Sequence, residues 1–455
     1  MLVYSAALIG LGLAIARLVK GSSDFFVAGR RLSAPLILAT VLAANIGAGA
    51  TVGAAGLGYR DGLAAWWWSG SAAIGSLFLA LFIGPRIWRA AKKHNLYTAG
   101  DYLELRYGPA VRAVVTSLIW LGTLSILAGQ LIAGSAVLSV VADVPRSTGI
   151  VLSALVMTVY FVAGGLLSSA WINAVQLVVL LAGFAVALPM VISSAGGMSQ
   201  LLAPASAPAG YGEMLHSTGP GSGWMLIALI PAFIISPGLM QKAYGASSER
   251  AVRWGIGVQA VVLGLFAFIP VLFGMAARAT HPLLTDPNVV LPTVLADQLP
   301  VALGALALAA VFSAEVSTCD ALLFMLATSL SQDMYKRFLR PQASDAQLLF
   351  AARAAAVAGA LGGVLFALWL PTVTDALRIF YALLGVSLLV PVVGGLYTRA
   401  GSAAALASIA AGIVTLLVVQ FAVAARYPWL DATLAGLAAA AVAYAVVAIA
   451  RRPRL

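Results

Sequence analysis

The sequence predicts an all-α polytopic membrane protein with about 13 transmembrane helices. Hydrophobic residues make up 62% of the 455 residues and charged residues only 9%, too little charge to cover a soluble protein of this size. Apolar runs of about 20 residues, long enough to cross a bilayer, recur along the whole chain. The predicted spans cover residues 2–20, 34–58, 64–91, 110–142, 148–164, 168–193, 222–241, 252–278, 299–332, 347–370, 374–397, 401–424 and 428–450.

The positive charges predict how the chain is oriented. If the N-terminus lies outside, 21 of the 26 Lys and Arg residues fall in cytoplasmic connections, which is the bias that membrane proteins show. The C-terminus is then cytoplasmic, and we expect a bacterial inner membrane. The net charge of +11 follows from these connections, so nucleic-acid binding is not expected. Five arginines remain on the outer side: Arg60, Arg146, Arg278, Arg378 and Arg426.

Composition also limits the function. Three histidines and one cysteine, Cys319, leave no disulfide framework and no zinc cluster. No nucleophile–base constellation is found, so an enzyme is not expected. The spans leave no room for a soluble domain, and residues 1–455 are predicted to form one transmembrane domain. The longest polar connection, 194–221, is expected to be an ordered or semi-ordered loop.

Two predicted spans carry residues that interrupt a helix. The stretch "AANIGAGATVGAAGLG", residues 43–58, has glycines at 47, 49 and 53 within an apolar run. Irregular backbone at membrane depth survives where it lines a cavity, and freed carbonyls there can coordinate a cation. The alternative is close helix packing, because Gly49 and Gly53 form a GxxxG pair. The second interruption is "LIPAFIISPGLMQKAYGASSER", with Pro231, Pro237 and Gly238.

The interruptions lie five spans apart, which predicts two inverted five-helix repeats. The repeats cover about 34–193 and 222–397, and the flanking helices are 2–20, 401–424 and 428–450.

A third stretch, "FSAEVSTCDALLFMLATSLSQDMYKRF", predicts a cation site. Ala314, Ser317 and Thr318 share one helix face and present only oxygen, which suits a hard cation. The alternative is that each hydroxyl bonds back to its own helix. Glu315 and Asp320 are ionisable residues in an apolar span, where such residues are costly and functional by default. The charged residues that follow are expected to form the solvated end of the helix: Asp333, Lys336 and Arg337.

Six motifs in order resemble the sodium/solute symporter family, which shares the leucine-transporter fold. They are "DFFVAGRRLS", "AANI", "YTAGDYLELRYG", "GGLLSSAWINAVQ", "GLMQKAYGASS" and "STCDALL…SLSQDMYKR". The resemblance implies sodium-coupled symport of a small organic solute by alternating access, with sodium as the coupling ion. It also implies the ligands of the main sodium site, which are the carbonyls of Ala43, Ile46 and Ala314 and the hydroxyls of Ser317 and Thr318.

The sequence departs from the family pattern at span 6, where many members carry an aspartate and this chain has Asn173. We hypothesise that the negative charge has moved to Asp320, so that Asn173 and Asp320 form a second cation site or carry a proton. The structural alternative is that Asp320 forms a hydrogen bond to Asn173 or to a backbone group and so holds the two helices in register. Positions that the sugar-transporting branch fills with polar groups fall on Ser69, Ala232 and Phe233, so a sugar of that branch is not expected.

A solute pocket is expected beside the broken helices. Glu315 is the only charged residue expected in the pocket. Pocket charge therefore does not select among carboxylates, amino acids, vitamins and other small solutes. Two alternatives to sodium symport also stay open, namely a proton-coupled transporter that uses Asp320 or Glu315 and a transporter-like sensor module. The candidate solute-binding residues are Asn45, Trp68, Ser69, Gln130 and Ser236.

Overall fold

The protein is described by a computed structural model that covers residues 27–163, 166–215, 223–427 and 429–451. Within these ranges the chain is helical, and strand-like pairing is limited to one isolated bridge between Leu32 and Ala246. Ten helices in these ranges are long and apolar enough to span a membrane. Two shorter apolar helices, Ala34–Asn45 and Arg146–Val159, accompany them. The expected span 2–20 lies outside the described residues, so the count of 13 stays a prediction.

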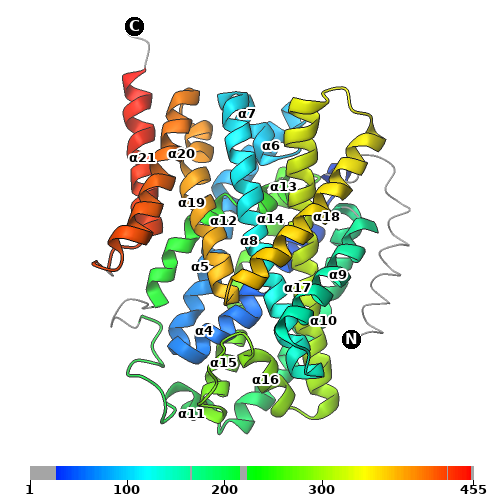
Figure 1. Ribbon diagram of the computed structural model, residues 1–455, viewed down its shortest axis with the longest axis vertical. Coiled ribbons are helices and arrows are strands. Elements are labelled where there is room, and N and C mark those ends of the chain that lie inside the picture. Colours follow the sequence, from blue (N-terminus) through cyan, green and yellow to red (C-terminus); the bar gives the residue numbers. More distant parts are fainter. Residues whose placement is uncertain (1–26, 164–165, 216–222, 428, 452–455) are drawn as a thin grey trace.

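The first half of the chain runs from η1 to α10 (Figure 1). Its elements are η1 (Ala28–Arg30), α3 (Ala34–Asn45), η2 (Gly49–Gly53), α4 (Ala54–Asp61), η3 (Gly62–Ala65), α5 (Trp66–Phe78), η4 (Leu79–Ile83), α6 (Gly84–His94), α7 (Ala99–Tyr107), α8 (Pro109–Ala142), α9 (Arg146–Ala163) and α10 (Leu166–Ser194).

The second half runs from α11 to α21. Its elements are α11 (Met198–Leu202), η5 (Gly223–Leu229), α12 (Ile230–Ile234), α13 (Pro237–Tyr244), α14 (Glu249–Phe266), α15 (Phe268–Thr280), α16 (Val290–Asp297), α17 (Val301–Thr328), η6 (Ser329–Leu339), α18 (Asp345–Trp369), α19 (Val373–Tyr397), α20 (Ser402–Val418), η7 (Val419–Val423) and α21 (Ala432–Ala450).

Helix α8 is the central element of the bundle, because it packs against α9, α17, α18 and α19. The broken helix α3 packs against α10, α14 and α17. Helices α20 and α21 pack mainly on each other and on α19, at the edge of the bundle (Figure 1). This arrangement places the interrupted segments inside the protein, where irregular backbone can find partners.

Among the described residues, arginines that the positive-charge pattern assigns to opposite sides are found at opposite ends of the bundle. At one end Arg30 donates to the carbonyls of Leu96 and Tyr244, and Arg106 donates to the carbonyl of Gly395. At the other end the Arg278 guanidinium donates to the carbonyl of Ser206. Figure 1 shows α6 and α7 at the first end and α4, α11 and α16 at the second. The first end is the one that the sequence predicts to be cytoplasmic.

The connection expected to be an ordered loop packs against α4 over its described part. The Tyr211 hydroxyl donates to the Gly58 carbonyl at 2.6 Å, and the Leu63 N–H donates to the Tyr211 carbonyl at 2.9 Å. Residues 216–222 of this loop lie outside the described residues.

Candidate functional site

The first predicted interruption is present. Helix α3 ends at Asn45, and Ile46 leaves the helical region with φ −97° and ψ 78°. The Ala48 N–H then lacks a partner in its own helix and donates to Gln130 Oε1 at 2.8 Å. A side chain from α8 therefore satisfies the backbone that the break frees, as membrane depth requires.

Close approach explains two of the glycines at this break. A Cβ on Gly47 would lie 2.3 Å from Thr318 Oγ1 and 2.7 Å from Gln130 Oε1. A Cβ on Gly49 would lie 2.2 Å from a methyl carbon of Leu377. A larger residue at 47 would collide with Thr318 and Gln130, whereas one at 49 would require the Leu377 side chain to move, so packing adds to the need for glycine at this break.

Oxygen atoms from the broken helix and from α17 meet as the cation site predicts. Ser317 Oγ lies 3.3 Å from the Ala43 carbonyl oxygen and 2.9 Å from that of Ala314. Thr318 Oγ1 lies 3.1 Å from the Ala43 carbonyl oxygen. Thr318 thus reaches across to α3, which disfavours the alternative that its hydroxyl bonds only to its own helix. Ile46 is fully buried and precedes Gly47, which packs on Thr318.

The chemistry of this cluster fits sodium. All the polar atoms are carbonyl or hydroxyl oxygens, which hard cations prefer. The residues that supply them are buried, with exposed fractions of 2–3% for Ala43, Ala314, Ser317 and Thr318. No carboxylate is needed for an ion of charge +1, because several oriented oxygen dipoles can replace its hydration shell.

The second interruption lies between α12 and α13, where Ser236 adopts φ −49° and ψ 119°. A cavity of about 60 Å³ lies between the two breaks. Three of the predicted solute-binding residues line it, namely Asn45, Gln130 and Ser236. Its apolar wall includes Phe233, Phe380 and Tyr381.

Trp68 and Ser69 do not line this cavity. The Trp68 ring packs against Tyr381 with ring centroids 5.9 Å apart, so it supports the cavity wall from behind. Ser69 is buried elsewhere on α5.

Lys242 is the residue that the sequence reasoning missed. It lines the cavity, is only 3% exposed, and donates from Nζ to Thr40 O at 2.6 Å and Thr40 Oγ1 at 3.2 Å. The expectation that Glu315 is the only charged pocket residue is therefore wrong. The span predicted from the sequence ends at residue 241, whereas the apolar helical span in the structure, Leu226–Tyr244, includes Lys242, and a lysine there is costly unless it has a role.

The ionisable residues of α17 have partners in the same region. Thr51 Oγ1 lies 2.9 Å from Glu315 Oε1 and 2.9 Å from the Gly47 carbonyl, which ties Glu315 to the broken segment. Asp320 is buried and lies within electrostatic range of the Lys242 ammonium. Asn173 is also buried, on α10, which packs along α17. A second cation site at Asn173 and Asp320 stays a prediction.

A second cavity opens at the other end, between α4 and the start of α19. Its volume is about 300 Å³, and its lining includes Tyr59, Arg60, Asp375 and Arg378. Arg60 forms a two-pronged pair with Asp61 at 2.7 and 2.6 Å. This outer cavity therefore carries charges of both signs.

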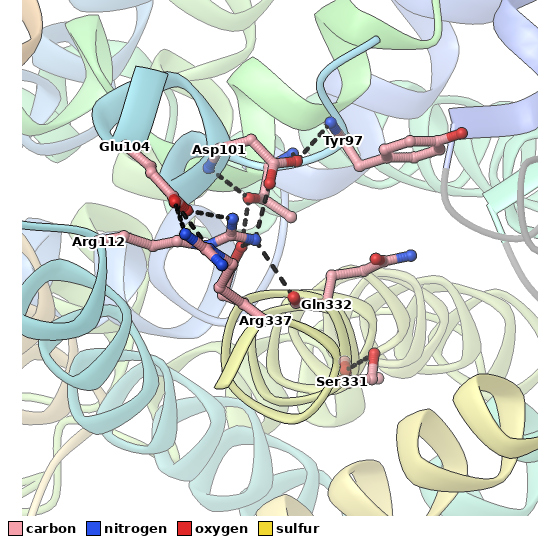
Figure 2. A network of polar contacts seen from close by, with 10 residues as sticks. Tyr97, Asp101, Glu104, Arg112, Ser331, Gln332 and Arg337 are labelled. Carbon is pink, nitrogen blue, oxygen red and sulfur yellow. Dashed lines mark hydrogen bonds and ion pairs between the residues drawn. The ribbon is translucent and has the colours of Figure 1, made fainter. Parts of the chain in front are cut away.

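A charge network joins α7, α8 and η6 at the first end, and Figure 2 shows its contacts. Arg112 on α8 pairs with Asp101, Glu104 and Asp333, each at 2.7 Å, and Arg337 pairs with Glu104 at 2.6 Å. The expectation that Asp333 is solvated is wrong, because its side chain is 2% exposed. The sequence pattern missed this because the partner, Arg112, lies more than 200 residues away.

Two broken helices, a buried oxygen cluster between α3 and α17, and a cavity between the breaks form the arrangement that secondary transporters use for ion and solute sites. The chain belongs to the sodium:solute symporter family, whose profile matches residues 25–412. It is a sodium-coupled symporter that works by alternating access.

Relatives support the same class. The chain is 27% identical over 400 residues to a sodium/glucose cotransporter of Vibrio parahaemolyticus, covering 78% of this chain and 71% of that protein. It is 27% identical over 365 residues to a sodium/pantothenate symporter of Escherichia coli K12, covering 77% and 74%.

Solved structures show the same fold. The structure of a Na⁺-coupled sialic acid symporter in an outward-open state matches with a TM-score of 0.81 and 18% identity, covering 99% of this chain and 97% of that one. The closed form of the nucleobase-cation-symport-1 family transporter Mhp1 matches with a TM-score of 0.60 and 15% identity, covering 93% and 94%.

Proposed function

We propose that this symporter imports a small organic solute across a bacterial inner membrane, with the α7 end of the bundle facing the cytoplasm. Sodium binds between α3 and α17, and the solute binds in the cavity between the two breaks. The observation that carries the proposal is the convergence of Ser317 and Thr318 on the Ala43 carbonyl.

The two sites share one piece of backbone, which supplies a coupling mechanism. Ala43 carries its carbonyl toward α17, and five residues later Ala48 donates its N–H to Gln130 at the cavity. Sodium between α3 and α17 fixes the conformation of the break and so fixes the wall of the solute cavity. Binding at one site then favours the conformation that the other site needs.

The repeat architecture is part of the same proposal. The breaks after Asn45 and after Ile234 lie five spans apart in the predicted order, as two inverted repeats require. Rocking of one group of helices about these breaks would expose the sites first to one side and then to the other.

The test is a thermal unfolding experiment on the purified full chain in sodium and in potassium buffer. A bound ion stabilises the folded state by about 2.7 kcal/mol at a concentration of 100 times Kd. Changing both Ser317 and Thr318 to alanine should remove the sodium-dependent increase in Tm. Thr328→Ala is the matched control, because its hydroxyl donates to the Phe324 carbonyl of its own helix at 2.7 Å. A double variant that keeps the sodium response would place the site elsewhere.

The second cation site is tested separately. If Asp320 and Asn173 hold a second ion, Asp320→Asn should lower the Hill coefficient for sodium in uptake assays. An unchanged sodium dependence would assign Asp320 to charge compensation of Lys242 instead.

A further inference from the structure

Two side-chain amides and one ammonium supply hydrogen-bond donors at the central cavity, from Asn45, Gln130 and Lys242. Asn45 Nδ2 and Gln130 Nε2 are buried and have no hydrogen-bond partner among the described residues. Both residues line the cavity, on α3 and α8. A buried donor without an acceptor costs about 1–3 kcal/mol, so a site that keeps two of them indicates a ligand that accepts hydrogen bonds.

The orientation of the Gln130 amide is fixed by the broken helix. Its Oε1 accepts the Ala48 N–H at 2.8 Å, and this N–H has lost its place in the helical ladder. If the Gln130 amide were flipped, its NH₂ group would face the Ala48 N–H, and two donors would oppose each other. The NH₂ group of Gln130 is therefore the part of the amide that remains available for a ligand.

Lys242 adds a positive charge to the same cavity. An ammonium has three protons, and Thr40 accepts two of them through its carbonyl and its hydroxyl. No carboxylate lines the cavity within the described part of the chain. The Asp320 charge that lies within range of Lys242 belongs to a residue outside the lining. The outer cavity, by contrast, presents Asp375 beside its arginines.

Another part of the lining is apolar. The Phe233 and Tyr381 rings lie with centroids 4.7 Å apart, and those of Phe380 and Tyr381 lie 5.4 Å apart. Leu322 and Met325 extend this surface. A solute that fills the cavity thus meets both hydrogen-bond donors and a large apolar surface.

The size of the cavity limits the carbon body. Its volume of about 60 Å³ corresponds to roughly four to six water positions at about 10–15 Å³ each. That space accommodates a body of a few carbon atoms in this conformation. A sugar ring with its shell of hydroxyl groups would need more room and more acceptors.

Building on the proposed symport function, we propose that the solute is a short-chain monocarboxylate. Its carboxylate oxygens accept hydrogen bonds from Lys242, Gln130 and Asn45, and its alkyl chain packs against the aromatic wall. A carboxylate matches this lining because it is acceptor-only and can receive several donors at once.

The first test measures the binding of three four-carbon probes to the purified full chain in sodium buffer: butyrate, its isostere butyramide, and the cation n-butylammonium. We expect butyrate to raise Tm, and we expect the amide and the amine to have little effect. The proposal is overturned if the amide or the amine stabilises the protein as well as butyrate does, or if none of the three does. Sodium without solute is measured in parallel. A sodium response without a butyrate response defeats this inference alone, whereas the absence of any sodium response defeats the symport sites.

Variants then assign the donors. Gln130→Glu keeps an acceptor for Ala48 but replaces the free NH₂ with a carboxylate oxygen, and Lys242→Met removes the charge. Each should weaken butyrate binding by roughly ten- to hundredfold, the range expected when a hydrogen bond to a charged group is lost. Lys242→Arg should retain part of the affinity, and Thr328→Ala, outside the cavity, should retain all of it. Every variant is first required to show a sodium-dependent Tm, which keeps misfolding apart from loss of binding. Unchanged butyrate affinity in both Gln130→Glu and Lys242→Met would refute the assignment.

Discussion

The two ends of the molecule close the central cavity by different means. At the α7 end, buried ion pairs join α7, α8 and η6. Toward the opposite end, the barrier is a layer of apolar side chains from α19. Leu377 lines the central cavity and Val373, one turn earlier, lines the outer cavity. Only about one helical turn of α19 therefore separates the two cavities.

The difference indicates which movements each barrier permits. An ion network buried in a low-dielectric environment requires one geometry, because an unpaired charge there is costly. A leucine can change rotamer or shift with its helix at much lower cost, and Leu377 packs on the glycines Gly49 and Gly129. The ion network at the predicted cytoplasmic end is thus expected to resist movement, whereas the apolar layer from α19 can move at low cost. We expect α19 to move first when the solute arrives from outside.

The largest effect is expected at the ion network. Arg112→Met leaves the buried Asp333 without its main partner and should lower the free energy of unfolding by about 3–5 kcal/mol. Arg337→Met is the control at the same network. Its side chain is 44% exposed, so the loss should be about 0–1 kcal/mol. Thermal unfolding measures both. Equal losses in the two variants would contradict the distinction between buried and exposed partners.

A cysteine in the central cavity shows which end opens. We suggest Ala321→Cys, a lining position, in a background where the buried native thiol is removed by Cys319→Ala. In Arg112→Met the new thiol should react faster with a membrane-impermeant reagent applied to the α7 side. Labelling that speeds up only from the opposite side would show that the network does not close this end.

Leu377→Ala should weaken the apolar barrier at the other end. Removing a well-packed leucine side chain lowers the free energy of unfolding by about 2–5 kcal/mol, and the space left by the side chain should join the two cavities. The same cysteine should then label faster from the outer side, with the rate from the α7 side unchanged. Leu377→Met, which keeps the volume, is the matched control. If both variants label alike, Leu377 is not the barrier.

The smallest effect concerns pH at the α7 end. Burial alone would raise the pKa of Glu104, but its pairs with Arg337 and Arg112 outweigh burial and hold the pKa below the usual value of about 4.3. The stabilisation is therefore fully present above pH of about 4.3 and is lost as pH falls through the lowered pKa. The pair is partly solvated, so about 1 kcal/mol is expected.

Glu104→Gln removes this titration. The Tm difference between the wild type and the variant should be nearly constant from neutral pH to pH of about 5 and should shrink as pH falls below about 4.3. A difference that persists well below this pH would assign the loss to packing rather than to charge.

Several features of this protein follow from local sequence alone. Apolar runs of membrane length predict the helical class, because only helices or closed barrels satisfy the backbone in lipid. Glycines and prolines predict both breaks, since these residues act on their own backbone. The oxygen set on α17 follows from helical spacing, which places Ser317 and Thr318 one turn from Ala314. These interactions span a few residues, so the pattern along the chain contains them.

Tertiary structure decided the features that join distant parts of the chain. The acceptor for Ala48 is Gln130, and the partner of Asp333 is Arg112, each supplied by α8. The packing of α13 against α3 decides whether Lys242 faces a loop or a cavity. The residue pattern of α13 alone does not specify this packing. The role of a charged group or of an unpaired donor depends on the groups that surround it in the folded protein. For this reason candidate sodium ligands could be named from the sequence, whereas Lys242 and the donors beside the solute cavity could not.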